Sequence, residues 1–242
     1  MPQERTEAVV LRGVDFSESS RIVTFLTPDR GRVACLAKGA RRKNCPYAAA
    51  LDTFNRVELV YYWKDGRNVQ TLGEAALLDA YPGIKGDLEK SVYAAFALEL
   101  AGKVAHENEP SQGLYAALVS GLENMAAWTG DARTHVCWQV LRLLREAGFE
   151  PVLDRCVRTG AAVSETPGFS YDGGVLAPGQ QADRRLSAGA YLALRGLNGA
   201  RDACPRVPTP PETFALLRLY AARQLDTEFR SARVIEEMFG KQ

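Results

Sequence analysis

The sequence predicts an α+β protein: an N-terminal five-stranded, OB-type β-barrel followed by an α-helical domain. The first eighty residues hold five short runs rich in Val, Ile, Thr and aromatic residues, each bounded by Gly, Asp, Pro or Asn. From about residue 83 the apolar residues recur at helical spacing instead. A chain of 242 residues can form two cores, so we expect a barrel domain at 1–80 and a helical domain at 81–242.

The predicted strands follow one another through short turns. They lie within the segments EAVVLRG, SRIVTFLTPDRG, GRVACLAKG, NRVELVYYWKDGR and NVQTLGEAAL. Pro28 marks the turn before the third strand, and Asp65-Gly66 marks the turn between the last two. Five short antiparallel strands that close on themselves match an OB-type barrel, although an SH3-like barrel would also fit.

The helical domain begins with a segment for which Asp87 is the expected N-cap. Its apolar residues are spaced as on a helix: Leu88, Val92, Phe96, Leu100 and Val104. Residues 111–128 and 132–149 continue this pattern, and helices resume after residue 185. Residues 150–185 are rich in Gly, Pro, Asp and Ser, which predicts an irregular segment or a small subdomain inserted between helices.

Composition and charge exclude several classes of protein. The chain is 46% hydrophobic and 24% charged, as in ordinary globular proteins, and its net charge of +1 means that a polyanionic partner would need a local cluster of cations. No run of about 18 apolar residues is present, so we expect no membrane span. The first ten residues carry charge where a signal peptide is apolar, which predicts a cytoplasmic protein.

No enzymatic motif is recognisable. The sequence lacks a Walker loop, a dinucleotide-binding fingerprint, HExxH and GxSxG. Of the two histidines, His106 lies near a predicted helix end, and His135 is only two residues from Cys137, so their side chains would point to different faces of a helix. The carboxylates form no obvious pair for two-metal chemistry. We therefore predict that the protein is not an enzyme.

One segment, LAKGARRKNCPY at residues 36–47, concentrates positive charge. Between residues 30 and 43 there are six cations and no acid. A solvated loop would explain this, but loops of OB-type barrels commonly bind nucleic acid, and phosphate contacts require Lys or Arg. The candidate DNA-binding residues are Lys38, Arg41, Arg42 and Lys43, with Arg21, Arg32 and Arg67 on neighbouring predicted strands and turns.

Aromatic residues of the barrel domain could stack on bases. The candidates are Tyr47, Phe54, Tyr61, Tyr62 and Trp63. Because side chains alternate along a strand, Tyr61 and Trp63 share one face and Tyr62 lies on the other, so at most one set can contact bases while the other packs in the core.

Several motifs resemble those of the bacterial DNA repair protein RecO family. FSESSRIVTFLTPDRGRVACLAKGARR, residues 16–42, has polar residues before an apolar strand, then T-P-x-x-G-R and A-K-G-A-R-R. LREAGFEPVLDRC fits L-x-x-x-G-F-x-P-x-L-x-x-C, and LDTFNRVELVYY and FSYDGGVL are similar to further family segments. The resemblance extends to about residue 175 and is weaker beyond.

The resemblance implies an N-terminal OB domain, a helical domain, binding of single- and double-stranded DNA, and annealing of complementary strands. It also implies partnership with RecR and with the C-terminal tail of single-stranded DNA-binding protein. An acidic tail with a terminal apolar residue would need an apolar groove rimmed by cations. Helices carrying Arg133, Trp138, Arg142 and Arg145 could supply that groove, or could present ordinary helix surface.

The family resemblance also implies a zinc module, from which this chain departs. Many relatives carry CxxC at the position of LDRCVRTG and a second CxxC after paired glycines. Here Cys156 remains, Thr159 stands at the second position, and no thiol follows Gly173-Gly174. Structural zinc takes four Cys or His ligands, so we predict no zinc and no other cofactor.

Together these features predict a DNA repair and recombination mediator that binds DNA, anneals strands and helps load the recombinase with RecR. Two alternatives remain open at this point. One is an OB-fold adaptor whose barrel binds protein, and the other is a nucleic-acid enzyme with an unrecognised site.

Overall fold

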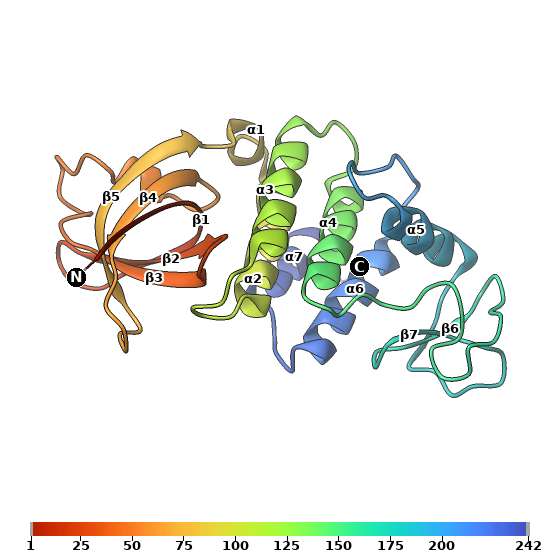
Figure 1. Cartoon of the computed structure of the whole chain (residues 1–242). Coiled ribbons are helices and arrows are strands. Elements are labelled where there is room, and N and C mark those ends of the chain that lie inside the picture. The colour runs from red at the N-terminus through yellow and green to blue at the C-terminus, as the bar shows by residue number, and fades with distance from the viewer. Residues whose placement is uncertain (1, 241–242) are drawn as a thin grey trace. The chain divides into compact units, whose positions relative to one another are not determined.

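The computed structural model describes residues 2–240, which form two compact units. The first unit contains the chain up to Gly86 together with Ala101–Ala126, and the second contains Asp87–Leu100 together with the chain from Ala127 onward. The helix α2 (Leu88–Val104) therefore contributes its first part to one unit and its end to the other. The elements can be followed in Figure 1.

The first unit is built on a closed five-stranded barrel. Its strands pair in the order β1-β2-β3-β5-β4, with β4 returning to β1. They are β1 (Gln3–Asp15), β2 (Arg21–Thr27), β3 (Gly31–Ala37), β4 (Arg56–Tyr62) and β5 (Gln70–Asp79). The α+β fold with an OB-type barrel is thus confirmed. All pairs are antiparallel except β3–β5, because an odd number of strands cannot alternate in direction around a closed ring.

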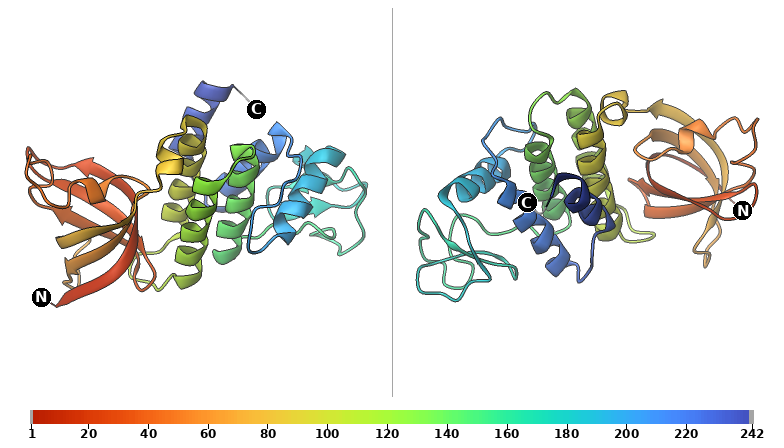
Figure 2. Two further views of the ribbon diagram at one scale, coloured as in Figure 1. Left: turned by 90° about the horizontal axis from the view of Figure 1, so that it is seen from above. Right: turned by 180° about the vertical axis from the view of Figure 1, so that it is seen from behind.

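The barrel core comes from alternate residues of the strands. Along β3 every second residue from Gly31 to Ala37 is buried, as expected for a strand with one face on a core. The 3₁₀ turn η1 (Ala49–Leu51) adds Ala50 and Leu51 to the same core. The two further views in Figure 2 show the strands of this barrel from above and from behind.

Short helical elements complete the first unit. These are α1 (Pro82–Lys85), the end of α2, and α3 (Gln112–Ala127). The expected cap at the start of α2 is present: the Lys90 backbone N–H donates to the carboxylate of Asp87 over 3.1 Å.

The second unit packs its helices around aromatic side chains. It contains the start of α2 with α4 (Ala132–Glu146), α5 (Ala188–Gly199), α6 (Pro211–Gln224) and α7 (Arg230–Phe239). Phe96 meets Phe214 edge-to-face at 5.2 Å and Phe229 at 4.8 Å between ring centroids. Within residues 2–240, no helix is long and apolar enough to cross a membrane.

The segment expected to be irregular contains a small sheet. Its strands are β6 (Gly168–Ser170), β7 (Gly174–Leu176) and β8 (Arg184–Arg185), in the order β7-β6-β8. Strands of two or three residues are too short to give an alternating sequence pattern. Phe169 is fully buried and meets Tyr220 of α6 edge-to-face, which attaches the sheet to the helices of the second unit.

Candidate nucleic-acid interface

The outer face of β2 and β3, which binds ligands in many OB folds, is partly covered within the first unit: Thr24 and Leu26 are buried, whereas Ile22, Ala34 and Leu36 are half-buried. Leu26 lies outside the barrel core yet has no exposed surface. The Arg32 backbone N–H donates to the His106 carbonyl over 3.0 Å. The Arg32 guanidinium donates to the Gly102 carbonyl over 2.8 Å and to Glu107 over 3.1 Å. Arg32 therefore fastens the barrel to the end of α2, and its side chain remains 35% exposed.

The loop after β3 presents four cations to solvent. Lys38, Arg41, Arg42 and Lys43 are all exposed. The loop turns tightly, since the Arg42 N–H donates to the Gly39 carbonyl over 2.9 Å and Gly39 has a φ of +72°. Ala40, in the middle of the loop, is buried against the barrel core and directs its charged neighbours outward.

The β1–β2 loop, residues 16–20, lies beside this cluster. Arg21 at the start of β2 pairs with Ala37 at the end of β3, so the two loops lie at the same end of the strands. The Arg41 N–H donates to the Ser19 carbonyl over 3.1 Å, and its guanidinium donates to the Ser17 carbonyl over 2.9 Å. We call the surface formed by these two loops the cationic rim, comprising Lys38, Arg41, Arg42, Lys43 and Arg21.

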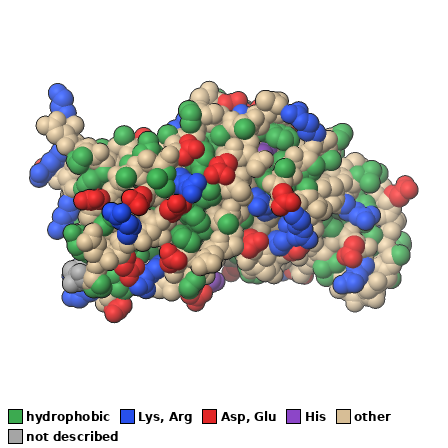
Figure 3. Space-filling view, turned by 45° about the horizontal axis from the view of Figure 1, so that its top comes forward, with side chains coloured by type: hydrophobic (Ala, Val, Ile, Leu, Met, Phe, Trp, Pro, Cys, Tyr) green, Lys and Arg blue, Asp and Glu red, His purple; other side chains and the backbone are tan. Residues whose placement is uncertain are grey.

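The carboxylate of Asp15 forms ion pairs with two arginines of the rim. Asp15 lies 3.4 Å from Nε of Arg21 and 3.3 Å from Nε of Arg41. Within residues 2–240, Lys38, Arg42 and Lys43 form no ion pair. The β1–β2 loop itself contains one acid, the exposed Glu18, so the five cations of the rim outnumber the two acids beside them, Asp15 and Glu18. Elsewhere, on the face seen in Figure 3, positive and negative side chains are interspersed.

Arg67 lies exposed in the loop between β4 and β5. Its backbone N–H donates to the Lys64 carbonyl over 3.3 Å, and its carbonyl accepts from the Gln70 side chain over 2.9 Å. Strand β5 begins at Gln70, which pairs in parallel with Cys35 near the end of β3. Within residues 2–240, no hydrogen bond or ion pair joins Arg67 to the residues of the cationic rim.

Most of the aromatic residues expected to contact bases are packed instead. Tyr61 and Trp63 are 1% and 8% exposed and belong to the barrel core, while Tyr62 is exposed on the opposite face, as the alternation predicts. Tyr47 is half-buried and donates its hydroxyl to the Lys38 carbonyl over 2.7 Å. Phe54 has a φ of +76° in the turn before β4.

Sequence reasoning missed the aromatic residue that does lie at the rim. Phe16, in the β1–β2 loop, is 63% exposed. The available signal was its position directly before the polar turn SESS, between two predicted strands. Such a loop lies at the end of a barrel rather than in its core, so an aromatic side chain there is not needed for packing.

The helical residues expected to form a partner groove do not line one together. Trp138 is fully buried and its indole N–H donates to the Ala200 carbonyl over 2.9 Å, so it is a core residue. The Arg142 guanidinium lies 4.6 Å from the Trp138 ring centre. Arg133 pairs with Asp131 over 2.8 Å.

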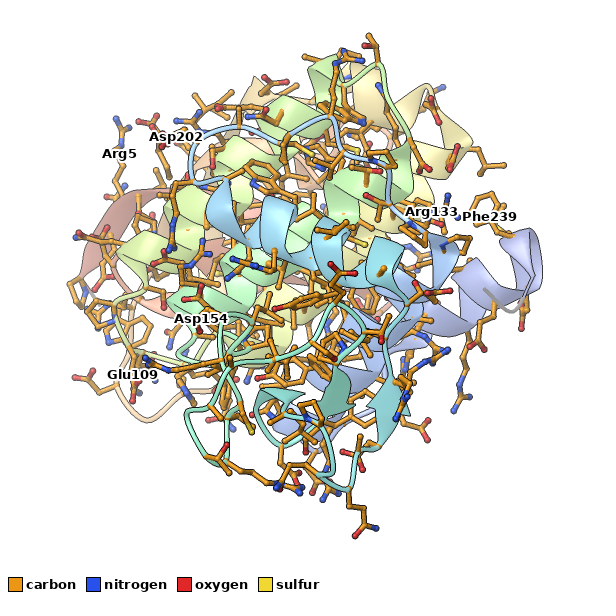
Figure 4. The ribbon with its side chains drawn as sticks, turned by 90° about the vertical axis from the view of Figure 1, so that its right-hand side faces the viewer. Arg5, Glu109, Arg133, Asp154, Asp202 and Phe239 are labelled. Atoms are coloured by element: carbon orange, nitrogen blue, oxygen red, sulfur yellow. The ribbon has the colours of Figure 1, made fainter. Side chains whose placement is uncertain are left out.

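Arg145 helps to build one wall of a nearby pocket. It pairs with Glu150 over 2.9 Å and also donates to the Asn198 carbonyl, and this arginine holds the pKa of Glu150 below its usual value. The pocket has a volume of about 450 Å³ and lies between the turn after α4 and α5, lined by residues 150–155, 195, 198, 199 and 201. In Figure 4, α5 crosses the front and the turn carrying Asp154 lies below it.

The position of the family's zinc module holds a single thiol. Cys156 is 1% exposed, and the hydroxyl of Thr159, with backbone N–H groups of Ala177, Thr159 and Arg158, lowers its pKa to about 7. Nowhere in residues 2–240 do three or more His, Cys, Asp or Glu side chains gather in a way that could hold a metal ion. One sulfur and one hydroxyl do not fit a tetrahedral zinc site.

The barrel and the helical region both match family models. Residues 1–81 match the model described as Recombination protein O N terminal, and residues 85–237 match Recombination protein O C terminal. The chain belongs to the RecO family. A relative from Anaeromyxobacter dehalogenans named DNA repair protein RecO is 31% identical over 98% of each chain. A protein of the same name from Myxococcus xanthus is 31% identical over 93% of this chain and 93% of its own length. Another, from Salinibacter ruber, is 30% identical over 98% of this chain and 94% of its own length.

Proposed function

We propose that this RecO-family chain is a DNA repair and recombination mediator that acts without covalent catalysis. It binds DNA strands at the cationic rim, anneals complementary strands, and assists recombinase loading together with RecR. The observation that carries this proposal is the exposed set of Lys38, Arg42 and Lys43, which form no ion pair among the described residues and are joined by two partly paired arginines.

The rim suits contacts with the DNA backbone. Lys and Arg bind phosphates and release condensed counterions, which gives affinity that falls with salt. Such contacts position a strand but carry no sequence information, so single and double strands both bind and the base edges stay available for pairing. Neutralising the phosphates of two strands lowers their mutual repulsion, which is the step that annealing requires.

The proposal is tested by mixing two complementary oligonucleotides with the protein in EDTA and without any nucleotide. We expect pairing to be faster than the spontaneous reaction, because charge neutralisation needs no metal or energy source. An enzyme of nucleic acids would instead cleave or modify the strands when Mg²⁺ is added. A protein-binding adaptor would leave the rate of pairing unchanged.

For the tail of single-stranded DNA-binding protein, the pocket beside α5 is a better site than the face around Trp138. Arg155, Arg195 and Arg201 surround it, and Pro151 and Leu153 supply apolar surface. An acidic peptide ending in an apolar residue would place its charges on the arginines and its last side chain on the apolar wall. The carboxylate of Glu150 at this pocket is already paired with Arg145.

Changing Arg195 and Arg201 together to Ala should weaken binding of such a peptide by about tenfold or more, since two charge-assisted contacts are lost. Fluorescence anisotropy with a labelled acidic peptide ending in Phe measures this. Arg5→Ala is the matched control, because Arg5 is an exposed arginine of the barrel paired with Glu58. If the double variant bound the peptide as tightly as the wild type, the proposal that the tail binds in this pocket would be wrong.

We further propose that the segment between α4 and α5 folds without metal. Backbone pairing takes the place of ligands: the Val152 N–H donates to the Gly173 carbonyl and the Val175 N–H donates to the Val152 carbonyl, both over 2.9 Å. The carboxylate of Asp183 accepts from the Tyr171 N–H over 2.8 Å. These contacts, with buried Phe169, hold the segment.

Chelation should accordingly leave the protein unchanged. We expect the Tm in excess EDTA to equal the Tm without it, because a chelator destabilises only a protein whose fold depends on a bound metal. Elemental analysis of the purified protein should find far less than one zinc per chain. A stoichiometric zinc that lowers the Tm when removed would contradict the proposal.

A further inference from the structure

The most exposed large apolar side chains of the first unit include two that flank Asp15. Phe16 is 63% exposed and Val14 is 55% exposed. Single exposed apolar residues are common on proteins and need no explanation. These two differ because the residue between them, Asp15, binds both Arg21 and Arg41 of the cationic rim.

The backbone that carries Phe16 is fixed rather than loose. The Phe16 N–H donates to the Ser20 carbonyl over 3.0 Å, and the Ser17 N–H donates to the same carbonyl over 3.3 Å. The Ser17 hydroxyl accepts from the Ser20 N–H over 3.2 Å. These bonds, with those of Arg41 to Ser17 and Ser19, fix the backbone of Phe16 relative to the rim, so the loop itself has little order to gain when a ligand binds.

From this arrangement we infer that Phe16 stacks on an unpaired base of a strand whose phosphates lie on the cationic rim. The inference rests on the proposed function and adds the substrate class to it: the rim alone accepts any phosphate backbone, and Phe16 makes the site prefer single strands. Every base offers a face for stacking, so the contact is tolerant of sequence. In a duplex the faces of each base are stacked on neighbouring bases, so the Phe16 ring has no base to stack on and adds no affinity.

The test compares Phe16→Ala with the wild type on three ligands of equal length: a single strand, a duplex, and a strand of abasic sites. We expect about tenfold or greater loss of affinity for the single strand, the scale of one lost base–aromatic contact, and no change for the duplex. The abasic strand keeps the phosphates and lacks the bases, so the two proteins should bind it equally. Phe16→Leu should behave nearly as Phe16→Ala, because it keeps apolar surface without a ring.

Tyr62→Ala is the matched control. Tyr62 is 39% exposed on the outer face of β4, where it pairs with Gln3 of β1 and Thr71 of β5, so this aromatic lies outside the two loops of the rim. Unchanged single-strand affinity of Phe16→Ala would overturn the inference. An equal loss on the duplex would also overturn it, since the ring would then be inserting between paired bases.

A second variant separates this inference from the proposed function. The three-alanine variant changes Lys38, Arg42 and Lys43 to Ala and should lose affinity for all three ligands, including the abasic strand. If the three-alanine variant binds weakly and Phe16→Ala binds normally, the rim stands and the stacking role fails. If the three-alanine variant binds all three ligands normally, the proposed rim itself is wrong.

Discussion

The three-alanine variant should bind a single-stranded oligonucleotide about a hundredfold more weakly than the wild type at 0.1 M salt. Each single-strand phosphate contact contributes about 0.7 to the slope of log K against log salt, so the loss of three contacts lowers the slope by about 2. The substituted side chains are exposed and unpaired within the described residues, so folding should not change. Anisotropy titrations at several salt concentrations between about 0.05 and 0.2 M measure both the affinity and the slope of log K against log salt.

Asp15→Asn should instead strengthen DNA binding, in contrast to the three-alanine variant. The substitution removes the carboxylate that pairs with Arg21 and Arg41, while Arg41 keeps its hydrogen bond to the Ser17 carbonyl. Affinity should rise and the salt slope should steepen by about 1, since the released arginines become available to phosphates. A weaker-binding Asp15→Asn with a normal Tm would show that the pairs with Asp15 position the rim rather than compete with DNA.

Gly174→Ala should lower the free energy of unfolding by about 3 kcal/mol or more. Gly174 has a φ of +140°, a conformation that residues with a side chain rarely adopt, and an added Cβ would lie 2.1 Å from the Val152 carbonyl oxygen. That carbonyl accepts the Val175 N–H, one of the bonds that we propose hold the segment without metal. Urea unfolding followed by circular dichroism, together with limited proteolysis of residues 150–185, measures the effect.

Gly179→Ala is the control in the same segment. Gly179 also has a positive φ, +83°, but nothing lies within 4 Å of the position of an added Cβ. Only the conformational cost remains, about 1 to 2 kcal/mol. If the two variants were equally stable, the close approach of Gly174 to Val152 would not matter and another interaction would have to hold the segment.

The barrel was predictable because its signals are local. Alternating apolar residues and turn residues follow from the geometry of each strand, and β3 shows the alternation residue by residue. The cluster at Lys38–Lys43 could be placed after a strand for the same reason. The parallel pairing of β3 with β5 joins segments far apart in sequence. It arises only when the barrel closes, so no pattern within either strand predicts it.

The assignment of individual side chains depended on tertiary contacts that the sequence does not display. Arg32 and Arg67 look alike as exposed cations near predicted strands. In the structure Arg32 binds Gly102 and Glu107, seventy residues or more away, whereas Arg67 bonds only to its neighbours Lys64 and Gln70 among the described residues. Helical spacing does not show whether Trp138 lies on a surface or in the core; in the structure it is fully buried and donates its indole N–H to the Ala200 carbonyl. Phe16 was overlooked because a single aromatic residue in a turn has no periodicity.

The most direct test of the account is the rate at which complementary oligonucleotides anneal with the wild type and with the three-alanine variant at equal protein concentration. We predict acceleration by the wild type and a rate close to the spontaneous one with the variant, because charge neutralisation at the rim is the proposed cause. A folded three-alanine variant that anneals strands as fast as the wild type would contradict this account.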